Sequence, residues 1–402
     1  KRVNHVLEYC RMRRRDFLKL VPLSVMPQLL SGCSGVGDLF NDSVEDEKFA
    51  LAGFRVDTLV SGLDTPWEIA WGPDDMIWVT ERGGTLRRIN PVSGLAASVE
   101  DVDVTEIGES GLLGLAFHPD FDAQPFVYLV HSFSIGNEIR NRLVRRRFNG
   151  VTLEAGEVLL DDIPGDGIHN GSRLAIGRDR LLYMTTGDAN RPHLSQELDS
   201  VAGKVLRLTL DGLPAPGNPF GTAIYSYGHR NAQGLVFHPD TDDLYLTEHG
   251  PADNDEVNRV EIGRNYGWPN VHGFCDNDVR IEDDFCEQNR VAEPVAAWTP
   301  TVAPCGADFY NSNLIPGWKG SFLFTALRGE ALIRLMLSPD GSRAVNEEIL
   351  FESEFGRLRD VLVGPNGQVY LATSNRDGRG NPSPDDDRIL RVVPELVKVE
   401  SV

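Results

Sequence analysis

The sequence predicts an all-β fold, a six-bladed β-propeller with four-stranded blades, and three observations lead to it. The chain of 402 residues contains 40 Gly, 24 Pro and 41% hydrophobic residues, which suits many short strands joined by tight turns. Apolar and polar residues alternate with a period of two in successive short segments, between turns of Asp, Gly and Pro. Similar segments recur at a spacing of roughly 40–50 residues, which is the period of propeller blades.

Each repeat has the order of a β-meander. A small apolar strand is followed by a Gly, Pro or Asp turn, by a second strand rich in Trp, Tyr, Leu and Thr, and by a third strand that ends near Arg. No long stretch of helical periodicity competes with this pattern. The six copies lie at 69–91, 114–133, 173–212, 234–250, 318–341 and 360–394.

Residues 1–32 are predicted to be an export signal. The run Arg14-Arg15-Asp16-Phe17-Leu18-Lys19 resembles a twin-arginine signal, and the apolar stretch after it is too short to span a bilayer. Leu30-Ser31-Gly32-Cys33 resembles a lipobox, which implies cleavage before Cys33 and a lipid on its thiol. The alternative is a plain cleaved signal with an incidental cysteine. We therefore expect an exported, periplasmic or extracellular protein that contacts the membrane only through a lipid anchor at Cys33.

The rest of the chain is predicted to be one domain. Residues 33–52 form a polar tether, and residues 53–396 form the propeller. The segment 270–300 breaks the repeat period and is interpreted as a long insertion on the face that bears the loops. In an oxidising compartment Cys275 and Cys286 could close a small disulfide loop, which would leave Cys305 free.

The composition excludes several classes of partner. Acidic residues outnumber basic ones 60 to 39, for a net charge of -21, whereas nucleic-acid binding needs a basic face. No cysteine and histidine spacing suggests zinc. No glycine-rich strand-to-helix turn suggests a nicotinamide cofactor.

Polar groups stand at matching positions in successive repeats. In a propeller, the loops of all blades converge on a central channel, so such residues can meet there although they are far apart in sequence. Arg357 and Arg359 are two residues apart on a strand and therefore point the same way. The candidate residues are Glu109 before GLLGLAFHPDF, His169 in IHNGSRL, Arg230 and Asn231 in GHRNAQG, Thr301 in WTPTVAP, Arg328 in FTALRG, and Arg357 and Arg359 in GRLRD.

These motifs resemble those of the soluble quinoprotein glucose dehydrogenases and aldose sugar dehydrogenases, six-bladed propellers that carry pyrroloquinoline quinone (PQQ). The resemblance runs from about Leu59 to Val393. It rests on the blocks GLLGLAFHPDF, GKVLRLTLDG, YGHRNAQGL, EHGP with DEVN, NYGWPNV, PTVAP and RLRDV, which occur in the order of that family.

The resemblance implies PQQ- and Ca²⁺-dependent oxidation of an aldose at C1 to the lactone. His169 is then the general base, a role that suits an imidazole near neutral pH, and Arg230 stabilises the charge that develops on the quinone. PQQ carries three carboxylates, which match arginine side chains. The implied cofactor-binding residues are Glu109, Arg230, Asn231, His249, Thr301, Arg328, Arg357 and Arg359.

The resemblance also implies two Ca²⁺ sites. The backbone carbonyls of Gly250 and Pro251 match the turn that holds the ion next to PQQ, and Ca²⁺ prefers oxygen ligands of this kind. Glu256 with the carbonyl of Tyr266 matches a second, structural site. An ordinary tight turn and a surface charge are the respective alternatives.

Some positions depart from the glucose dehydrogenase pattern. Ile168 stands where those enzymes carry Asp, Glu109 where they carry Gln, and Arg328 where they carry Lys, while Ser172 replaces a Gly that is frequent in aldose dehydrogenases. The Glu109 and His-Asn-Gly pattern is closer to the aldose sugar dehydrogenases. An aldose is therefore the expected substrate, and a cytochrome or a quinone the expected electron acceptor.

Two other functions are compatible with a propeller. A lactonase-like hydrolase would need a metal held by side-chain carboxylates and amides on the channel axis, where this chain offers arginines. A non-catalytic lipoprotein that binds sugar or protein would need neither His169 nor the arginine set.

Overall fold

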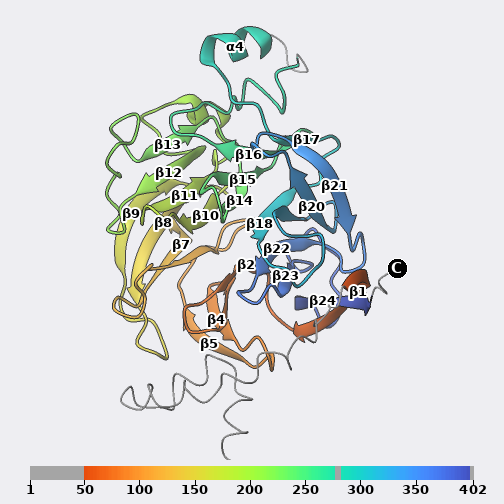
Figure 1. Cartoon of the computed structure of the whole chain (residues 1–402). Coiled ribbons are helices and arrows are strands. Elements are labelled where there is room, and N and C mark those ends of the chain that lie inside the picture. The colour runs from red at the N-terminus through yellow and green to blue at the C-terminus, as the bar shows by residue number, and fades with distance from the viewer. Residues whose placement is uncertain (1–48, 277–281, 399–402) are drawn as a thin grey trace, which may run out of the picture. The chain divides into compact units, whose positions relative to one another are not determined.

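The structure is a computed structural model that describes residues 49–276 and 282–398. In these residues six four-stranded antiparallel sheets are arranged as the blades of a β-propeller, which confirms the predicted fold class (Figure 1). The predicted signal at 1–32, Cys33 and the tether up to residue 48 lie outside the described residues. Strand β1 (Phe49–Val60) begins earlier than the predicted propeller boundary at residue 53.

Five blades are each built from four consecutive strands. The first strands of neighbouring blades contact one another, so these strands surround the central channel. The blades are β2 (Pro66–Trp71), β3 (Ile77–Glu81), β4 (Thr85–Ile89) and β5 (Ala96–Asp101); β6 (Leu112–Phe117), β7 (Phe126–Ile135), β8 (Glu138–Arg147) and β9 (Glu157–Pro164); β10 (Gly171–Ile176), β11 (Leu182–Thr186), β12 (Lys204–Leu208) and β13 (Ile224–Tyr227); β14 (Ala232–Phe237), β15 (Leu244–Glu248), β16 (Asp255–Val260) and β17 (Ala296–Trp298); and β18 (Pro304–Tyr310), β19 (Ser321–Ala326), β20 (Ala331–Leu337) and β21 (Ala344–Leu350).

The sixth blade joins the two ends of the propeller sequence. It consists of β22 (Leu358–Val363), β23 (Val369–Thr373), β24 (Ile389–Lys398) and β1, which pairs with β24. The repeat pattern did not reveal this closure, because β1 has no turn or partner strand next to it in sequence. Pairing the first strand with the last one removes two free sheet edges.

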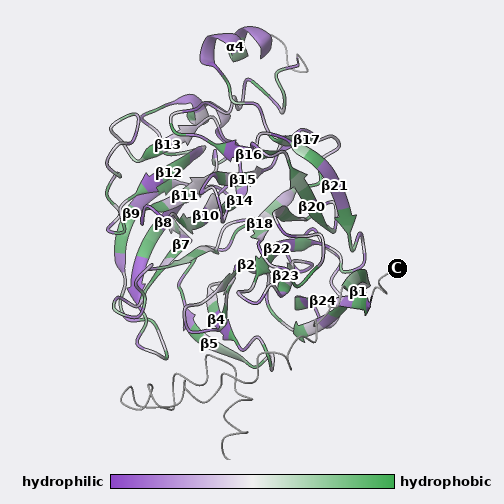
Figure 2. Ribbon diagram, viewed as in Figure 1, coloured by the Kyte–Doolittle hydropathy of each residue, from purple (hydrophilic) through white to green (hydrophobic). Residues whose placement is uncertain are grey.

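The core lies between the blades. Among the described residues, six hydrophobic clusters each join adjacent blades, as where Trp78 of β3 packs edge-on against Phe117 of β6. The second strands β3, β11, β15 and β23 are buried at every position because both of their faces are covered by other blades. Figure 2 shows the resulting hydrophobic strands, in contrast to the hydrophilic helix α4 (Glu282–Asn289).

Buried carboxylates connect the inner strands of different blades. Glu68 Oε2 accepts the backbone N–H of Leu115 in the next blade at 2.7 Å, and Asp360 Oδ2 accepts that of Ile69 at 2.7 Å. Arg173 pairs with Asp360 at 2.9 Å. Channel-facing N–H groups have no partner strand, so these side chains supply the missing acceptors.

The insertion follows β16 and ends at β17. It contains α4, and Cys275 and Cys286 form the predicted disulfide, while Cys305 is free and buried. A short 3₁₀ helix, η2 (Pro192–Gln196), lies between β11 and β12. In the described part of the chain, no helix combines the length and the apolar character needed to cross a membrane.

Candidate active site

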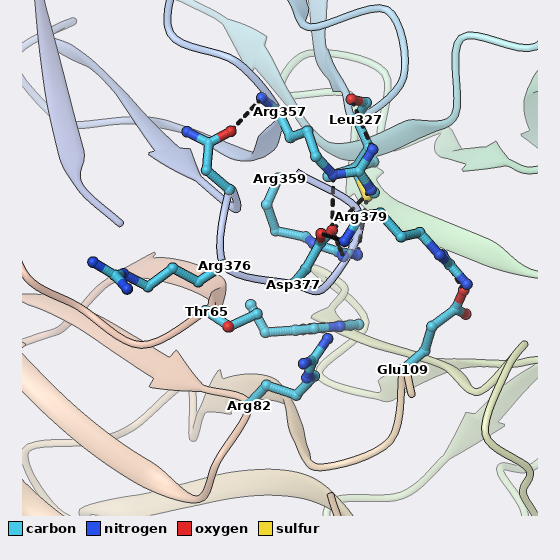
Figure 3. A network of polar contacts seen from close by, with 12 residues as sticks. Thr65, Arg82, Glu109, Leu327, Arg357, Arg359, Arg376, Asp377 and Arg379 are labelled. Carbon is cyan, nitrogen blue, oxygen red and sulfur yellow. Dashed lines mark hydrogen bonds and ion pairs between the residues drawn. The ribbon is translucent and has the colours of Figure 1, made fainter. Parts of the chain in front are cut away.

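The candidate residues come together where the inner strands begin. His169 precedes β10, Arg230 and Asn231 precede β14, and Arg357 and Arg359 lie at the start of β22. Because the inner strands all start at the same end of the channel, these residues of three different blades face one another there. Figure 3 shows Arg357 and Arg359 directed toward Asp377, and Arg379 reaching toward Glu109.

His169 is paired with a buried carboxylate. Its Nδ1 lies 2.8 Å from Asp188 Oδ1, and the Asp188 side chain is fully buried. Asp188 also accepts the backbone N–H of Asn190 at 2.8 Å and Nε1–H of Trp268 at 2.9 Å. A carboxylate that accepts from Nδ1–H fixes the imidazole tautomer and leaves Nε2 as the proton acceptor, which is the arrangement of a general base.

The backbone of His169 is also constrained. Its φ is 59°, in the left-handed region, and its N–H donates to Glu109 Oε2 at 3.1 Å. A side chain at Gly187 would place Cβ only 1.9 Å from the His169 carbonyl oxygen, so the close approach of this segment requires glycine. Together Glu109 and Gly187 hold the base in a conformation that a non-glycine residue rarely adopts.

Glu109 links His169 to the opposite side of the channel. Its Oε1 accepts a hydrogen bond from Arg379 Nη1 at 2.7 Å. Glu109 precedes β6, whereas Arg379 lies in the loop between β23 and β24. Burial alone would raise the pKa of Glu109, but the Arg379 guanidinium and the His169 N–H lower it to about 2 from an ordinary value of 4.5.

We expect this ionised carboxylate to make acid stability depend on Glu109. Because its pKa is lowered in the folded state, its stabilising contribution is complete above pH 4.5 and is lost as the pH falls toward 2. The unfolding free energy of wild type minus that of Glu109→Gln should therefore shrink by roughly 1–3 kcal/mol between pH 6 and pH 2–3. Denaturant titrations of the cofactor-free proteins at each pH measure this difference in unfolding free energy. A difference that does not change with pH would contradict the expected role of Glu109.

Two arginines at the start of β22, Arg357 just before it and Arg359 within it, share one carboxylate. Arg357 Nε and Nη2 donate to Asp377 Oδ2 at 2.9 and 2.8 Å, and Arg359 Nη2 lies 3.8 Å from the same oxygen. Both arginines are buried, at 8% and 5% exposure. The predicted common direction of this pair is confirmed. Arg359 Nη1 also contacts Gln233 Oε1 at 3.2 Å and the sulfur of Cys305 at 3.4 Å.

Several buried donors of this site have no partner among the described residues. They are Nε of Arg230, Nδ2 of Asn231 and Nε of Arg359, and Nε2 of His249 is also unpartnered. Burial lowers the pKa of His249 to about 4. Nε of Arg88, Arg264 and Arg391, outside the site, is likewise unpartnered, but at this site the donors lie close together and suit a ligand with acceptor oxygens. Three carboxylates and two quinone oxygens, as in PQQ, fit this donor set.

Two of the predicted cofactor residues, Thr301 and Arg328, do not join the group of buried donors described above. Thr301 uses its hydroxyl to donate to Asp255 Oδ2 at 2.6 Å, so it is part of a loop anchor. Arg328 is exposed, and no hydrogen bond or ion pair joins its guanidinium to another described residue. Its backbone N–H donates to Val302 O at 3.0 Å. The structure therefore does not bring Arg328 into the network formed by the other arginines.

The turn at Gly250 and Pro251 is rich in backbone oxygens. A Cβ at Gly250 would lie 1.8 Å from Asp253 O and 2.7 Å from Asn254 O, so only glycine fits. Gly250 N–H donates to Asp255 Oδ1 at 2.8 Å. Both residues of the turn line a small cavity together with Arg230 and Glu256. The carbonyl oxygens of Asp253 and Asn254 thus lie close to the turn whose own carbonyls are the predicted Ca²⁺ ligands.

At the second predicted metal position, the carboxylate of Glu256 accepts hydrogen bonds from other groups of the protein. Glu256 Oε1 accepts from Gly273 N at 2.8 Å and Oε2 from Asn258 Nδ2 at 2.6 Å, while burial raises its pKa to about 8. Tyr266 is buried, stacks on His229 at 4.6 Å and donates its hydroxyl to Arg259 O. Residues 49–276 and 282–398 contain no cluster of three or more His, Cys, Asp or Glu side chains suited to a metal.

Sequence reasoning missed four side chains that the structure places at the site. Asp188 follows strand β11 in the segment TTGDAN, and a carboxylate directly after a buried strand was the available signal. Trp268 lies in the quoted block NYGWPNV but was not singled out. Asp377 and Arg379 lie in the loop after β23, in a segment assigned only to a repeat.

Comparisons with known proteins identify the family of the chain. The model of the glucose/sorbosone dehydrogenase family matches residues 63–391. Quinoprotein glucose dehydrogenase B of Acinetobacter calcoaceticus is 32% identical, over 85% of this chain and 89% of its own length. An aldose sugar dehydrogenase of Escherichia coli is 31% identical, over 82% and 92%.

Among solved structures, the PQQ-bound aldose sugar dehydrogenase of Streptomyces coelicolor is 37% identical and superposes with a TM-score of 0.73, covering 86% of this chain and 99% of that one. The family model covers most of the chain, and the relatives are covered over nearly their whole length. The chain therefore belongs to the glucose/sorbosone dehydrogenase family and is a sugar dehydrogenase, an oxidoreductase.

Proposed function

We propose that the protein oxidises aldose sugars at C1 to the lactone, with PQQ and Ca²⁺ as cofactors and His169 as the general base. The observation that carries this proposal is the His169–Asp188 pair next to buried Arg and Asn donors that lack partners. A carboxylate-oriented imidazole removes a proton, and unpaired cationic donors bind an anionic cofactor. The names of a quinoprotein relative and of a PQQ-bound neighbour support the same cofactor.

The residues have distinct tasks in this proposal. Arg357, Arg359 and Arg230 bind the cofactor carboxylates and quinone oxygens, with Asn231 as a further donor, and Glu109 and His249 border the same site. The carbonyls of Gly250 and Pro251 would hold the Ca²⁺. When bound, PQQ supplies the acceptor for the hydride that leaves C1 of the sugar.

His169 acts on the other half of the reaction. Its Nε2 accepts the proton of the C1 hydroxyl as the C1–O bond becomes a carbonyl, and Asp188 stabilises the imidazolium that forms. Buried at 0% exposure, Asp188 interacts with this charge more strongly than it would in water. Arg230 lies on the cofactor side, where negative charge develops.

Several parts of the proposal rest on the sequence resemblance. These are a second Ca²⁺ at Glu256 and the Tyr266 carbonyl, cofactor contacts of Thr301 and Arg328, and export with a lipid on Cys33. Electron transfer to a cytochrome or quinone belongs to the same group. The hydrolase alternative would need side-chain carboxylates and amides around a metal on the channel axis, and the described residues group no three His, Cys, Asp or Glu side chains that could hold one.

Reconstitution tests the function directly. Purified protein with PQQ and CaCl₂ is expected to reduce an artificial dye with an aldose, and EDTA is expected to abolish this because Ca²⁺ holds the cofactor. Binding is measured separately by the absorbance change of PQQ. Dye reduction without Ca²⁺, or no absorbance change and no turnover with both cofactors present, would contradict the proposal.

A further inference from the structure

Trp268 lies between the two halves of the site. Its Nε1–H donates to Asp188 Oδ2 at 2.9 Å, and the guanidinium carbon of Arg230 lies 5.2 Å from the centroid of its ring. One side chain thus contacts both the partner of the base and a cofactor-binding arginine. We propose that Trp268 is a positioning residue for sugar oxidation, which orients the His169–Asp188 pair through its N–H and Arg230 through its ring; this rests on the proposed function.

The contact with Asp188 determines which carboxylate oxygen is available to His169. Asp188 Oδ2 accepts from Trp268, while Oδ1 accepts from Asn190 N at 2.8 Å and pairs with His169 Nδ1 at 2.8 Å. Because Asp188 is fully buried, an oxygen without a donor would be costly, and the carboxylate would rotate to find one. The Trp268 N–H therefore holds the carboxylate plane in which His169 is aligned.

The contact with Arg230 leaves its donors available. The guanidinium is held by the ring face, a cation–π contact, and by one bond from Nη1 to His249 O at 3.2 Å. Its Nε is buried and has no partner in the described part of the chain. A ring face attracts the cation without using its N–H groups, so they stay free for an acceptor ligand.

Trp268 is itself held from the other side. Its ring stacks on His272 with centroids 5.1 Å apart, its carbonyl accepts from Gln196 Nε2 at 2.6 Å, and its N–H donates to Gly228 O at 3.0 Å. An element with a packed ring and paired backbone groups can orient two neighbours without moving.

Two substitutions separate the two contacts. Trp268→Phe keeps an aromatic face for Arg230 but removes the N–H, so kcat should fall about 10-fold while the PQQ dissociation constant changes less than 2-fold. Trp268→Leu removes both, so PQQ binding should in addition weaken roughly 5- to 20-fold. The matched control is Trp298→Phe. Trp298 lies on the outer strand β17, and its Nε1–H also donates to a carboxylate, that of Glu347 on β21.

A spectroscopic measurement makes the test independent of turnover. In cofactor-free protein labelled with ¹⁵N-histidine, Trp268→Phe should broaden or shift the Nδ1–H signal of His169, whereas Trp298→Phe should leave it unchanged. Glu109, Arg379 and Arg230, the other charged groups around His169, are the same in all variants. An unchanged His169 signal in Trp268→Phe, with kcat equal to that of Trp298→Phe, would overturn the inference. If wild type has no turnover with PQQ, the proposed function fails, and the signal alone decides the role of Trp268.

Discussion

Replacing His169 by alanine is expected to lower kcat with an aldose by ~10²–10⁴-fold while PQQ binding stays within about 2-fold. The reason is that the imidazole, oriented by Asp188, accepts the hydroxyl proton but makes no charged contact to the cofactor. Single-turnover reduction of bound PQQ by the sugar measures the chemical step apart from re-oxidation by the dye.

The matched control is His193→Ala. His193 is exposed in η2, in the same blade as His169, and should be replaceable without loss of activity. Equal single-turnover rates for His169→Ala and wild type would remove His169 from the mechanism. A parallel loss of PQQ binding would instead assign it a role in holding the cofactor.

Replacing both Arg357 and Arg359 by glutamine is expected to raise the PQQ dissociation constant by roughly 10²–10³-fold. Each buried arginine contributes a charge-assisted hydrogen bond worth about 1.5–3 kcal/mol, and 1.4 kcal/mol corresponds to a factor of ten. Arg359→Gln alone keeps the Arg357–Asp377 pair and should raise the dissociation constant about 10-fold. Equilibrium titration of the cofactor-free protein with PQQ in CaCl₂ measures these values.

The control is Arg145→Gln with Arg147→Gln. These arginines are also two residues apart on one strand, but they lie on β8, where Arg145 pairs with Glu157 and Asp211. PQQ affinity should be unchanged in this variant. A thermal unfolding transition shows that the Arg357 and Arg359 variant is folded. The cofactor assignment would be wrong if this folded variant bound PQQ as tightly as the control.

Local features of the sequence were sufficient for much of the fold. Period-two patterning and regular turn signals depend on residues close together in the chain, so the strands and the number of blades could be predicted. The common direction of Arg357 and Arg359 was predicted from strand spacing, but Arg357 lies just before β22 and the register shifts between Leu358 and Asp360, so the structure was needed to establish it. The pairing of β1 with β24 could not be predicted in this way, because it joins strands more than 300 residues apart.

The site shows the same division between local and distant information. Asp188, Asp377 and Arg379 lie in loops after the second strands of their blades, whereas their predicted partners His169, Arg357 and Glu109 precede first strands. In a blade these two kinds of loop lie at the same end, so folding places Asp188 next to His169 and Asp377 next to Arg357. No spacing rule in the sequence joins these pairs.

By itself, the sequence determined the propeller class, the six repeats, the family and the residue types that the site offers, whereas it left open whether Cys275 and Cys286 are bonded. The tertiary structure decided which of them act together: Asp188 rather than a neighbour in sequence orients His169, Trp268 contacts both Asp188 and Arg230, and Arg328 stays outside the network. The physical reason is that strand patterns record burial over a few residues. A channel site depends instead on loops of different blades that meet only when the ring closes.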